Sequence, residues 1–234
     1  MISILTLNLW RYYDFDIRLP NIIKAIQDNQ PDVVCLQEVQ IDPSVSPFSQ
    51  VEILKEKLPE YKYSIHSTIY LKDSQRGKKL EKPVQHGMAM LSKYPIVNSF
   101  EFFVTPNEGE AEPRSILCFD VEIGSGVFKF ANIHFANRED WAKNQLEEFL
   151  GFLNSRGEKR ILAGDFNMFK LPEYDALSGY KLSYDYKSYE SYPKDGGCLD
   201  YVAIPDEFSF TKGELLEEYL SDHKGLLANI EQER

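Results

Sequence analysis

The chain has 234 residues, 43% of them hydrophobic and 27% charged, so it is long enough to bury a large core as a single domain over residues 1–234. It carries 26 Lys and Arg against 37 Asp and Glu, which gives a formal net charge of −11. This acidity excludes the broad basic surface of a protein that coats nucleic acid regardless of sequence. A phosphate-bearing substrate must therefore be bound locally, by a few cations or by a metal ion.

The cysteines and the N-terminus indicate the compartment. Cys35, Cys118 and Cys198 are an odd number without a close pair, which predicts reduced core thiols and excludes a disulfide framework or a zinc site. The N-terminal segment has no basic residue before its apolar stretch and contains Thr6 and Asn8, unlike a signal peptide. No apolar run approaches the ~18 residues of a membrane span. We expect a soluble, cytoplasmic protein with no membrane span, and we infer no obligate protein partner.

The N-terminal elements follow from hydrophobic periodicity. Residues 2–9 predict a buried strand, 20–29 a short helix, and 33–39 (VVCLQEV) a second apolar strand after a Pro-Asp pair. Apolar residues at helical spacing over 51–58 predict a helix. Apolar residues at every second position over 61–71 predict a strand.

Residues 72–85 (KDSQRGKKLEKPVQ) predict a long polar connection. They hold five Lys or Arg and two acids and form the one notably basic stretch of the sequence. Two interpretations stay open, a solvated loop and a loop that faces a substrate and attracts phosphate.

Strands dominate the C-terminal part of the chain. Hydrophobic patterning predicts strands at 86–92, 96–104 and 114–123, and a Gly-Ser-Gly turn at 124–126 that leads by a hairpin into VFKFANIH. Residues 138–155 predict a helix with an apolar stripe made of Trp141, Leu146, Phe149, Leu150 and Leu153. Three more strands follow in RILAGDF, CLDYVAI and GLLANI. Strands this apolar need burial on both faces, which indicates two packed sheets covered by helices.

Polar residues recur where these strands end. They are Asn8, Glu38, His134, Asp165, Asn167, Asp200, Asp222 and His223. A single strand-end Asn, Asp or His is usually a turn former or an ordinary satisfied side chain. Glu38, directly after Val-Val-Cys-Leu-Gln, would be costly to desolvate without a cation. Together the eight residues predict one shared rim.

Such a rim suits metal-assisted hydrolysis of a phosphoester. Hard oxygen ligands (Glu38, Asn8 and Asp222), without a cluster of Cys or His, favour Mg²⁺ or Mn²⁺ over Zn²⁺. A bound Mg²⁺ polarises phosphorus and offsets charge on the leaving oxygen. Asp165 is a candidate to orient or deprotonate the attacking water, and an Asp200–His223 pair a candidate for proton transfer.

At this point the sequence resembles a known family. The segments TLNLW, LQEV, HGMAMLSKYPI, NIHFAN, GDFN, LDYV and SDHKGL span residues 6 to 226. In this order they resemble the endonuclease/exonuclease/phosphatase superfamily, which includes deoxyribonuclease I. GDFN with a downstream SDH is the most specific part of the match.

The resemblance implies an α+β fold, a four-layer α/β/β/α sandwich with the active site at one end of the two packed sheets. Asn8 and Glu38 match the metal-binding pair, with Glu38 the principal ligand. Asp222 matches the neighbouring acid in the metal environment. Arg114, which opens the strand RSILCFDV, occupies the place of a phosphate-contacting arginine in some members; the alternative is a solvent-facing charge at a strand end.

The catalytic residues are carried over in the same way. His134 matches the histidine that contacts the scissile phosphate, and Asn167 its companion amide. Asp165 matches the residue that orients the nucleophilic water. Asp200 matches the aspartate that pairs with the catalytic histidine, and His223 that histidine.

Three departures from the family pattern narrow the range of activities that the resemblance implies. Trp10 and His134 stand where the exonuclease III branch usually has an aspartate and an asparagine, which disfavours an abasic-site endonuclease. Cys198 replaces an arginine that many members place two residues before the aspartate of LDYV. His86 has two open interpretations, a substrate contact and a structural role, whereas His66 is interpreted as structural.

The favoured function is a Mg²⁺-dependent phosphodiesterase, with a nuclease or nucleotide phosphodiesterase ahead of a phospholipid, inositol-phosphate or sugar-phosphate hydrolase. Its expected partner is a phosphate-ester substrate, for which nucleic acid is one candidate. A catalytically silent binding module would lack at least one of Glu38, Asp165 and His223, and all three are present.

Aromatic residues offer one hint about the substrate. Trp10, Tyr12, Tyr13, the 72–85 stretch and the tyrosine-rich segment 180–192 form either a wall for stacking a base or sugar, or ordinary core and surface aromatics.

Overall fold

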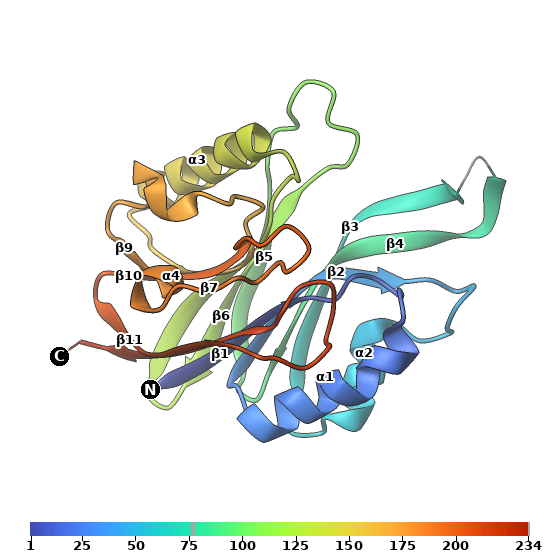
Figure 1. Cartoon of the computed structure of the whole chain (residues 1–234), viewed down its shortest axis with the longest axis horizontal. Helices are drawn as coiled ribbons and strands as arrows, with labels where there is room; N and C mark the ends of the chain where they lie inside the picture. Colours follow the sequence, from blue (N-terminus) through green and yellow to red (C-terminus); the bar gives the residue numbers. More distant parts are fainter. Residues whose placement is uncertain (76–77, 234) are drawn as a thin grey trace.

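Two six-stranded mixed sheets form the centre of the computed structural model, which describes residues 1–75 and 78–233 (Figure 1). The first sheet has the strand order β11 (Phe208–Leu215), β12 (Leu226–Gln232), β1 (Ile2–Asn8), β2 (Val33–Ile41), β4 (Lys78–Ser92) and β3 (Tyr63–Gln75). Within it, β1 and β2 are parallel and the other neighbours antiparallel.

The second sheet repeats this pattern. Its order is β5 (Ile96–Phe103), β6 (Ser115–Ile123), β7 (Gly126–His134), β8 (Ile161–Asp165), β10 (Asp200–Pro205) and β9 (Tyr180–Leu182). Strands β7 and β8 are parallel and the other pairs antiparallel. The predicted hairpin is present, since Ile123 pairs with Gly126 across the turn between β6 and β7.

Helices cover the outer face of each sheet. Helices α1 (Phe15–Asn29) and α2 (Gln50–Lys57) lie on the first sheet, and α3 (Glu139–Ser155) lies on the second (Figure 1). Short turns η1 (Leu171–Glu173) and η2 (Asp175–Leu177) and helix α4 (Ser183–Tyr186) follow β8. The expected four-layer α/β/β/α sandwich is confirmed.

Each central strand is apolar on both faces because it separates two cores. In β1, Ile4 packs in the core between the sheets, whereas the adjacent Leu5 packs against the helices. In β8, Ala163 faces the core between the sheets and Leu162 faces the core under α3. This alternation explains the nearly continuous hydrophobic runs of the sequence.

The basic stretch 72–85 is strand and not the connection expected from the sequence. Residues 72–75 and 78–85 extend β3 and β4 into a long ribbon that projects from the body, while 76 and 77 lie outside the described residues (Figure 1). Pairs such as Leu71 with Gln85 and Lys72 with Val84 continue the ladder. Backbone pairing holds this ribbon together, and most of its described side chains are exposed, so hydrophobic alternation did not reveal it.

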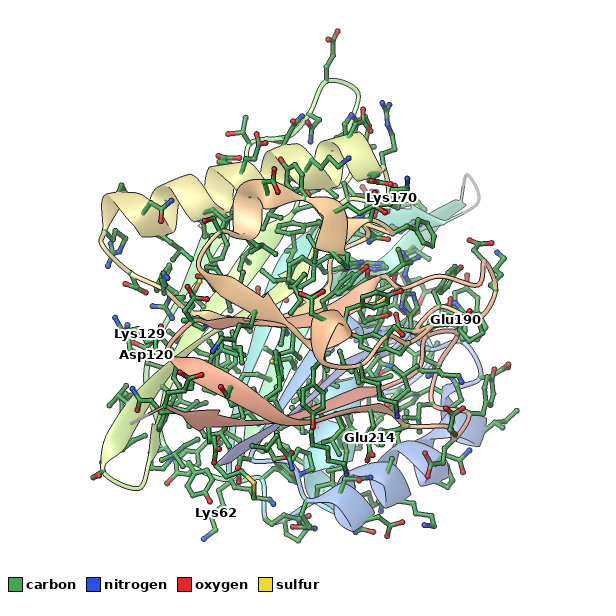
Figure 2. The ribbon with its side chains drawn as sticks, turned by 60° about the vertical axis from the view of Figure 1, so that its left-hand side comes forward. Lys62, Asp120, Lys129, Lys170, Glu190 and Glu214 are labelled. Carbon is green, nitrogen blue, oxygen red and sulfur yellow. The ribbon has the colours of Figure 1, made fainter. Side chains whose placement is uncertain are left out.

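Other differences are local. Helix α1 begins at Phe15 rather than near residue 20, and β9 and β11 were not predicted from the sequence. The three cysteines are buried free thiols, as expected. Charged side chains such as Lys62, Lys170 and Glu190 extend outward from the ribbon (Figure 2). In the parts of the chain that the structure describes, no helix is both long enough and apolar enough to cross a membrane.

Candidate active site

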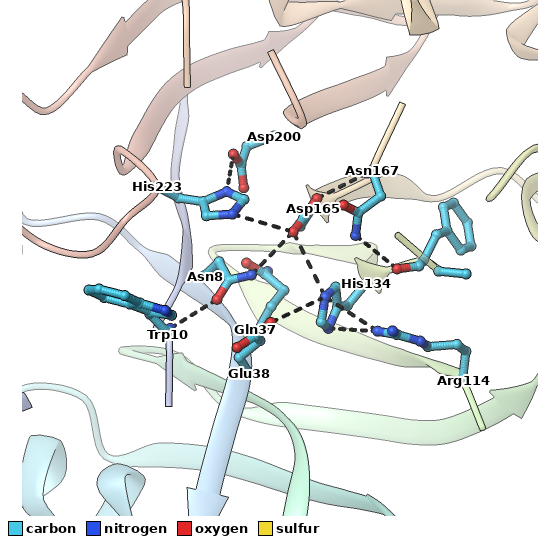
Figure 3. Close-up of polar contacts among 12 residues, drawn as sticks. Asn8, Trp10, Gln37, Glu38, Arg114, His134, Asp165, Asn167, Asp200 and His223 are labelled. Atoms are coloured by element: carbon cyan, nitrogen blue, oxygen red, sulfur yellow. Dashed lines mark hydrogen bonds and ion pairs between the residues drawn. The ribbon is translucent and has the colours of Figure 1, made fainter. Parts of the chain in front are cut away.

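The polar residues predicted to share a rim converge at one end of the two sheets (Figure 3). Strands β1, β7 and β8 end there, at Asn8, His134 and Asp165. The register places His134 beside Asp165 on the parallel pair β7 and β8, and Asp200 beside Asp165 on the antiparallel pair β8 and β10. Strand pairing therefore brings together residues far apart in the sequence.

Unusual backbone conformations concentrate at this end. Glu38 lies in a register shift between Leu36 and Val39 and has a φ of 51°, and Asn167 has a φ of 52°. Trp10 and Arg11 also have positive φ, so four of the six such non-glycine residues in the described chain lie at the rim. Left-handed backbone at residues other than glycine costs on the order of 1 kcal/mol each and is retained mainly at functional positions.

Asp165 is buried and held by two donors. Asn8 Nδ2 donates to Asp165 Oδ2 at 3.1 Å, and the backbone N–H of Asn167 donates to Asp165 Oδ1 at 2.9 Å. The Asn8 amide is oriented in turn by the Trp10 N–H, which donates to its Oδ1 at 2.9 Å. Burial raises the pKa of Asp165 above its usual range, and the Asp200 carboxylate adds to this against the opposing His223. Asp165 is thus an oriented carboxylate of increased basicity.

His223 forms a buried pair with Asp200. Its Nδ1 lies 2.8 Å from Asp200 Oδ2, and its Nε2 lies 3.9 Å from Asp165 Oδ2 (Figure 3). Burial lowers the pKa of His223, but the carboxylates of Asp200 and Asp165 outweigh it and raise that pKa to about 10. The ring is therefore an imidazolium at neutral pH, fixed in orientation by Asp200.

His134 is neutral by contrast. Burial lowers its pKa well below 6.5, and the nearby cations Arg114, His223 and Arg11 act in the same direction. Its Nε2 lies 3.3 Å from Arg114 Nη1, 3.8 Å from Asp165 Oδ2 and 4.0 Å from Glu38 Oε1. A neutral imidazole beside a guanidinium offers one donor to an anionic ligand without a further charge.

Arg11 is a site residue that the sequence did not reveal. Its Nε lies 3.1 Å from Glu38 Oε2, with side-chain exposures of 29% for Arg11 and 20% for Glu38. Both side chains are thus partly exposed, unlike those of the Asp200–His223 pair. One feature of the sequence could have indicated it, because Arg11 is a cation directly after the segment TLNLW in an acidic chain.

A cavity of about 630 Å³ joins these groups. Eight predicted residues line it, namely Asn8, Glu38, Arg114, His134, Asp165, Asn167, Asp222 and His223, and Asp200 lies behind His223. Arg11, Tyr192 and residues 109–112 also line it. Trp141, expected in the core stripe of the 138–155 helix, instead lies half-buried at the cavity wall with Arg138 4.2 Å above its ring.

A buried amide network fixes the two sheets beneath the cavity. Gln37 Nε2 donates to Asn132 Oδ1 at 2.7 Å, and Asn132 Nδ2 donates to the carbonyls of Leu36 and Ala89 at 3.0 and 2.9 Å. These bonds cross from β7 to β2 and β4. They set the spacing between the sheet that carries Glu38 and the sheet that carries His134 and Asp165.

Two sets of side chains could hold a metal ion. Asp165, Asp200 and His223 offer ligand atoms that all lie within 4.8 Å of one another. Glu38, Asn8 and Asp222 offer oxygen atoms to the same cavity. Asp222 Oδ1 accepts a hydrogen bond from Ser221 Oγ at 3.0 Å, which leaves its other oxygen available.

Known proteins share sequence features and a fold with this chain. The model of the endonuclease/exonuclease/phosphatase family matches residues 5–223. An endonuclease/exonuclease/phosphatase structure from Beutenbergia cavernae has a TM-score of 0.82 at 21% identity, covering 99% of this chain and 72% of that one. No curated protein sequence matches significantly.

Two further structures share the fold. The mannosyl-6-phosphatase Bt3783 of Bacteroides thetaiotaomicron has a TM-score of 0.72 at 18% identity, covering 98% of this chain and 99% of its own. TDP2 of D. rerio, complexed with a single-strand DNA product, has a TM-score of 0.70 at 15% identity, covering 99% of each chain.

Proposed function

Because the chain belongs to the endonuclease/exonuclease/phosphatase family, we propose that it is a metal-dependent phosphoesterase that hydrolyses a phosphodiester. One observation carries the proposal. The oriented Asp165 and the Asp200-bound imidazolium of His223 face the same cavity as Glu38, His134 and Arg114. A base for water and cations for phosphate are thus assembled around one space.

Asp165 is the proposed base. It orients a water molecule and takes its proton, while the water oxygen forms a bond to phosphorus and the bond from phosphorus to the leaving oxygen breaks. The hydrogen bonds from Asn8 and Asn167 hold the carboxylate in place for this step. Raised basicity of Asp165, caused first by its burial, favours proton acceptance.

Three other side chains bind the phosphoryl group in this proposal. His134, Arg114 and Asn167 line the cavity beside Asp165. The Asn167 amide donates to the Phe135 carbonyl at 2.9 Å, which fixes its orientation. His223 places a positive charge where negative charge develops on the phosphoryl oxygens, and Asp200 keeps that imidazolium in place.

The donor set fits a hard divalent cation. Glu38 and Asn8, with Asp222 nearby, supply carboxylate and amide oxygens, which suit Mg²⁺ and, as a substitute, Mn²⁺. The ion would act as a Lewis acid on the phosphoryl oxygen and offset charge on the leaving oxygen. The Asp165–Asp200–His223 group is the weaker candidate, because a protonated imidazole has no lone pair for a metal.

The substrate is proposed to be a nucleic acid or nucleotide diester. TDP2, which has this fold, is complexed with single-strand DNA. A sugar phosphate is the second candidate, because a mannosyl-6-phosphatase has the same fold and a similar length.

A substrate panel with Mg²⁺ or Mn²⁺ tests the proposal, using supercoiled plasmid, single-stranded DNA, RNA, bis-p-nitrophenyl phosphate, inositol phosphates, mannose 6-phosphate and sphingomyelin. We expect hydrolysis that chelator abolishes and that Asp165→Asn removes. Asp28→Asn, at an exposed site on α1 that pairs with Lys24, is the matched control. Equal rates with and without chelator would contradict the mechanism, and no turnover of any substrate would favour a silent binding module.

A further inference from the structure

A second cavity, of about 280 Å³, lies at the base of the β3–β4 ribbon. One wall consists of Tyr12 and Tyr13, the facing ribbon contributes Leu80 and Val84, and Val45 closes a side. None of these residues has a part in the proposed hydrolysis.

This cavity adjoins the active site. Arg11 lines both the second cavity and the main one. A small gap of about 20 Å³ is lined by residues of both cavities, namely Arg11, His86, Glu38 and His134. A group attached to a phosphate at His134 would pass over Arg11 to reach the base of the ribbon.

The walls suit a flat, largely apolar group. Tyr13 and Val45 remain 56% and 60% exposed, although both are large hydrophobic side chains at the edge of a cavity. Tyr12 is held by its hydroxyl, which donates to the Phe48 carbonyl at 2.9 Å, and Tyr13 lies 5.3 Å from the ring of Trp10. These rings are fixed or supported before a ligand arrives, which reduces the entropy cost of stacking.

The polar groups of the cavity suit a phosphate-linked ligand. Lys72 and Arg11 place positive charge at its margins. His86 stacks on Tyr70 with ring centroids 4.7 Å apart, and Gln40 contacts its ring at 3.1 Å. These contacts fix the His86 ring as a wall of the cavity, and Gln40 and Asp42 supply hydrogen-bonding groups for ring substituents.

We propose that this second cavity binds a planar ring group, as in a nucleobase or an aryl ester, on the part of the substrate that stays attached to the scissile phosphate. The inference rests on the proposed function, since it assigns the substrate's non-leaving group. It favours a small, ring-bearing diester over a long polyanion.

Two diesters with the same leaving group test this inference. The p-nitrophenyl ester of thymidine 5′-phosphate carries a ring on the retained side, whereas methyl p-nitrophenyl phosphate does not. Base stacking on an aromatic side chain is worth roughly tenfold or more in affinity. We expect Val45→Asp, which places a charge in the cavity, to reduce kcat/KM for the thymidine diester about tenfold through KM and to change the methyl diester under about twofold.

Val127→Asp is the matched control. Val127 is 54% exposed at the start of β7, so this substitution adds the same charge away from the cavity. Tyr13→Ala should reproduce the effect, with Tyr186→Ala as its control on α4. Equal losses for both diesters, or none for either, would overturn the proposal.

Calorimetric titration with thymidine 5′-monophosphate separates this inference from the hydrolytic function. Binding that Val45→Asp weakens and Val127→Asp preserves supports the ring subsite even in a protein that turns over neither diester. Binding equally affected by both variants, or no binding, overturns it whether or not the protein hydrolyses phosphoesters.

Discussion

The two sides of the cavity hold their charges differently. Asp165 and Asp200 on the second sheet, and His223 in the loop before β12, are buried and bound to one another or to fixed amides. On the first sheet, Glu38 contacts Arg11, both residues have left-handed backbone, and both side chains are partly exposed. The buried group pairs its own charges, whereas the partly exposed Glu38 is the carboxylate that we propose binds a second cation, the metal ion. In the proposed mechanism, proton transfer falls to the buried group and metal binding to Glu38.

The largest expected effect comes from substitutions in the buried Asp200–His223 pair. His223→Asn removes the imidazolium and should lower kcat by roughly 10²- to 10⁴-fold. Asp200→Asn should act through the same group, so the double variant should lose little more than either single one. Steady-state kinetics with Mg²⁺ on bis-p-nitrophenyl phosphate measure all three. Multiplicative losses would show that Asp200 and His223 do not act as a unit.

The next largest effect is expected at Glu38, whose contact with Arg11 is partly exposed. Glu38→Gln keeps the size of the side chain and removes its charge, so the Mg²⁺ concentration for half-maximal activity should rise at least about tenfold. Stability should change little, because the Glu38–Arg11 pair is partly exposed. The exposed Glu56, beside Lys57, gives the control Glu56→Gln. An unchanged Mg²⁺ dependence would locate the metal elsewhere in the cavity.

The convergence of the site was predictable because strand ends are visible as breaks in apolar runs. Asn8, His134 and Asp165 each terminate such a run, and all line one cavity. Their proximity depends on sheet order, which periodicity does not specify; the family resemblance supplied it. Their catalytic roles remain predictions.

Features that depend on three-dimensional context escaped prediction. Arg11 reaches Glu38 only because two consecutive residues adopt left-handed backbone. Trp141 has the helical spacing of the core-facing residues of α3. It lies near the start of that helix, however, where it lines the cavity and not the core. Arg18 would be assigned to the surface by its charge but is buried.

Arg18 offers a test of how the two sides are joined. Its Nη1 donates to the Leu220 carbonyl at 2.7 Å and its Nε to the Tyr13 carbonyl at 2.8 Å. It therefore ties the turn that carries Arg11 to the loop before Asp222. Arg18→Met should lower the free energy of unfolding by about 2 kcal/mol or more, because buried carbonyls lose their donors.

Urea denaturation measures this loss. Arg18→Lys retains the charge but cannot span both carbonyls, so it should recover only part of the stability. Full recovery with lysine would mean that charge, and not the fork of the guanidinium, stabilises the two loops.

The smallest effect concerns pH and a residue at the junction of the two cavities. Burial lowers the pKa of His86 to about 4, with Arg11 and Lys72 acting in the same direction. The unfolded chain binds this proton near pH 6.5, so the folded state loses stability as the pH falls from about 6.5 towards 4. His86→Gln should remove this component, reducing the stability lost between pH 7 and pH 5 by about 2 kcal/mol or less. Urea unfolding of both proteins at the two pH values measures it, since carboxylate contributions cancel in the difference. Parallel losses in the two proteins would mean that His86 titrates alike in the folded and unfolded states.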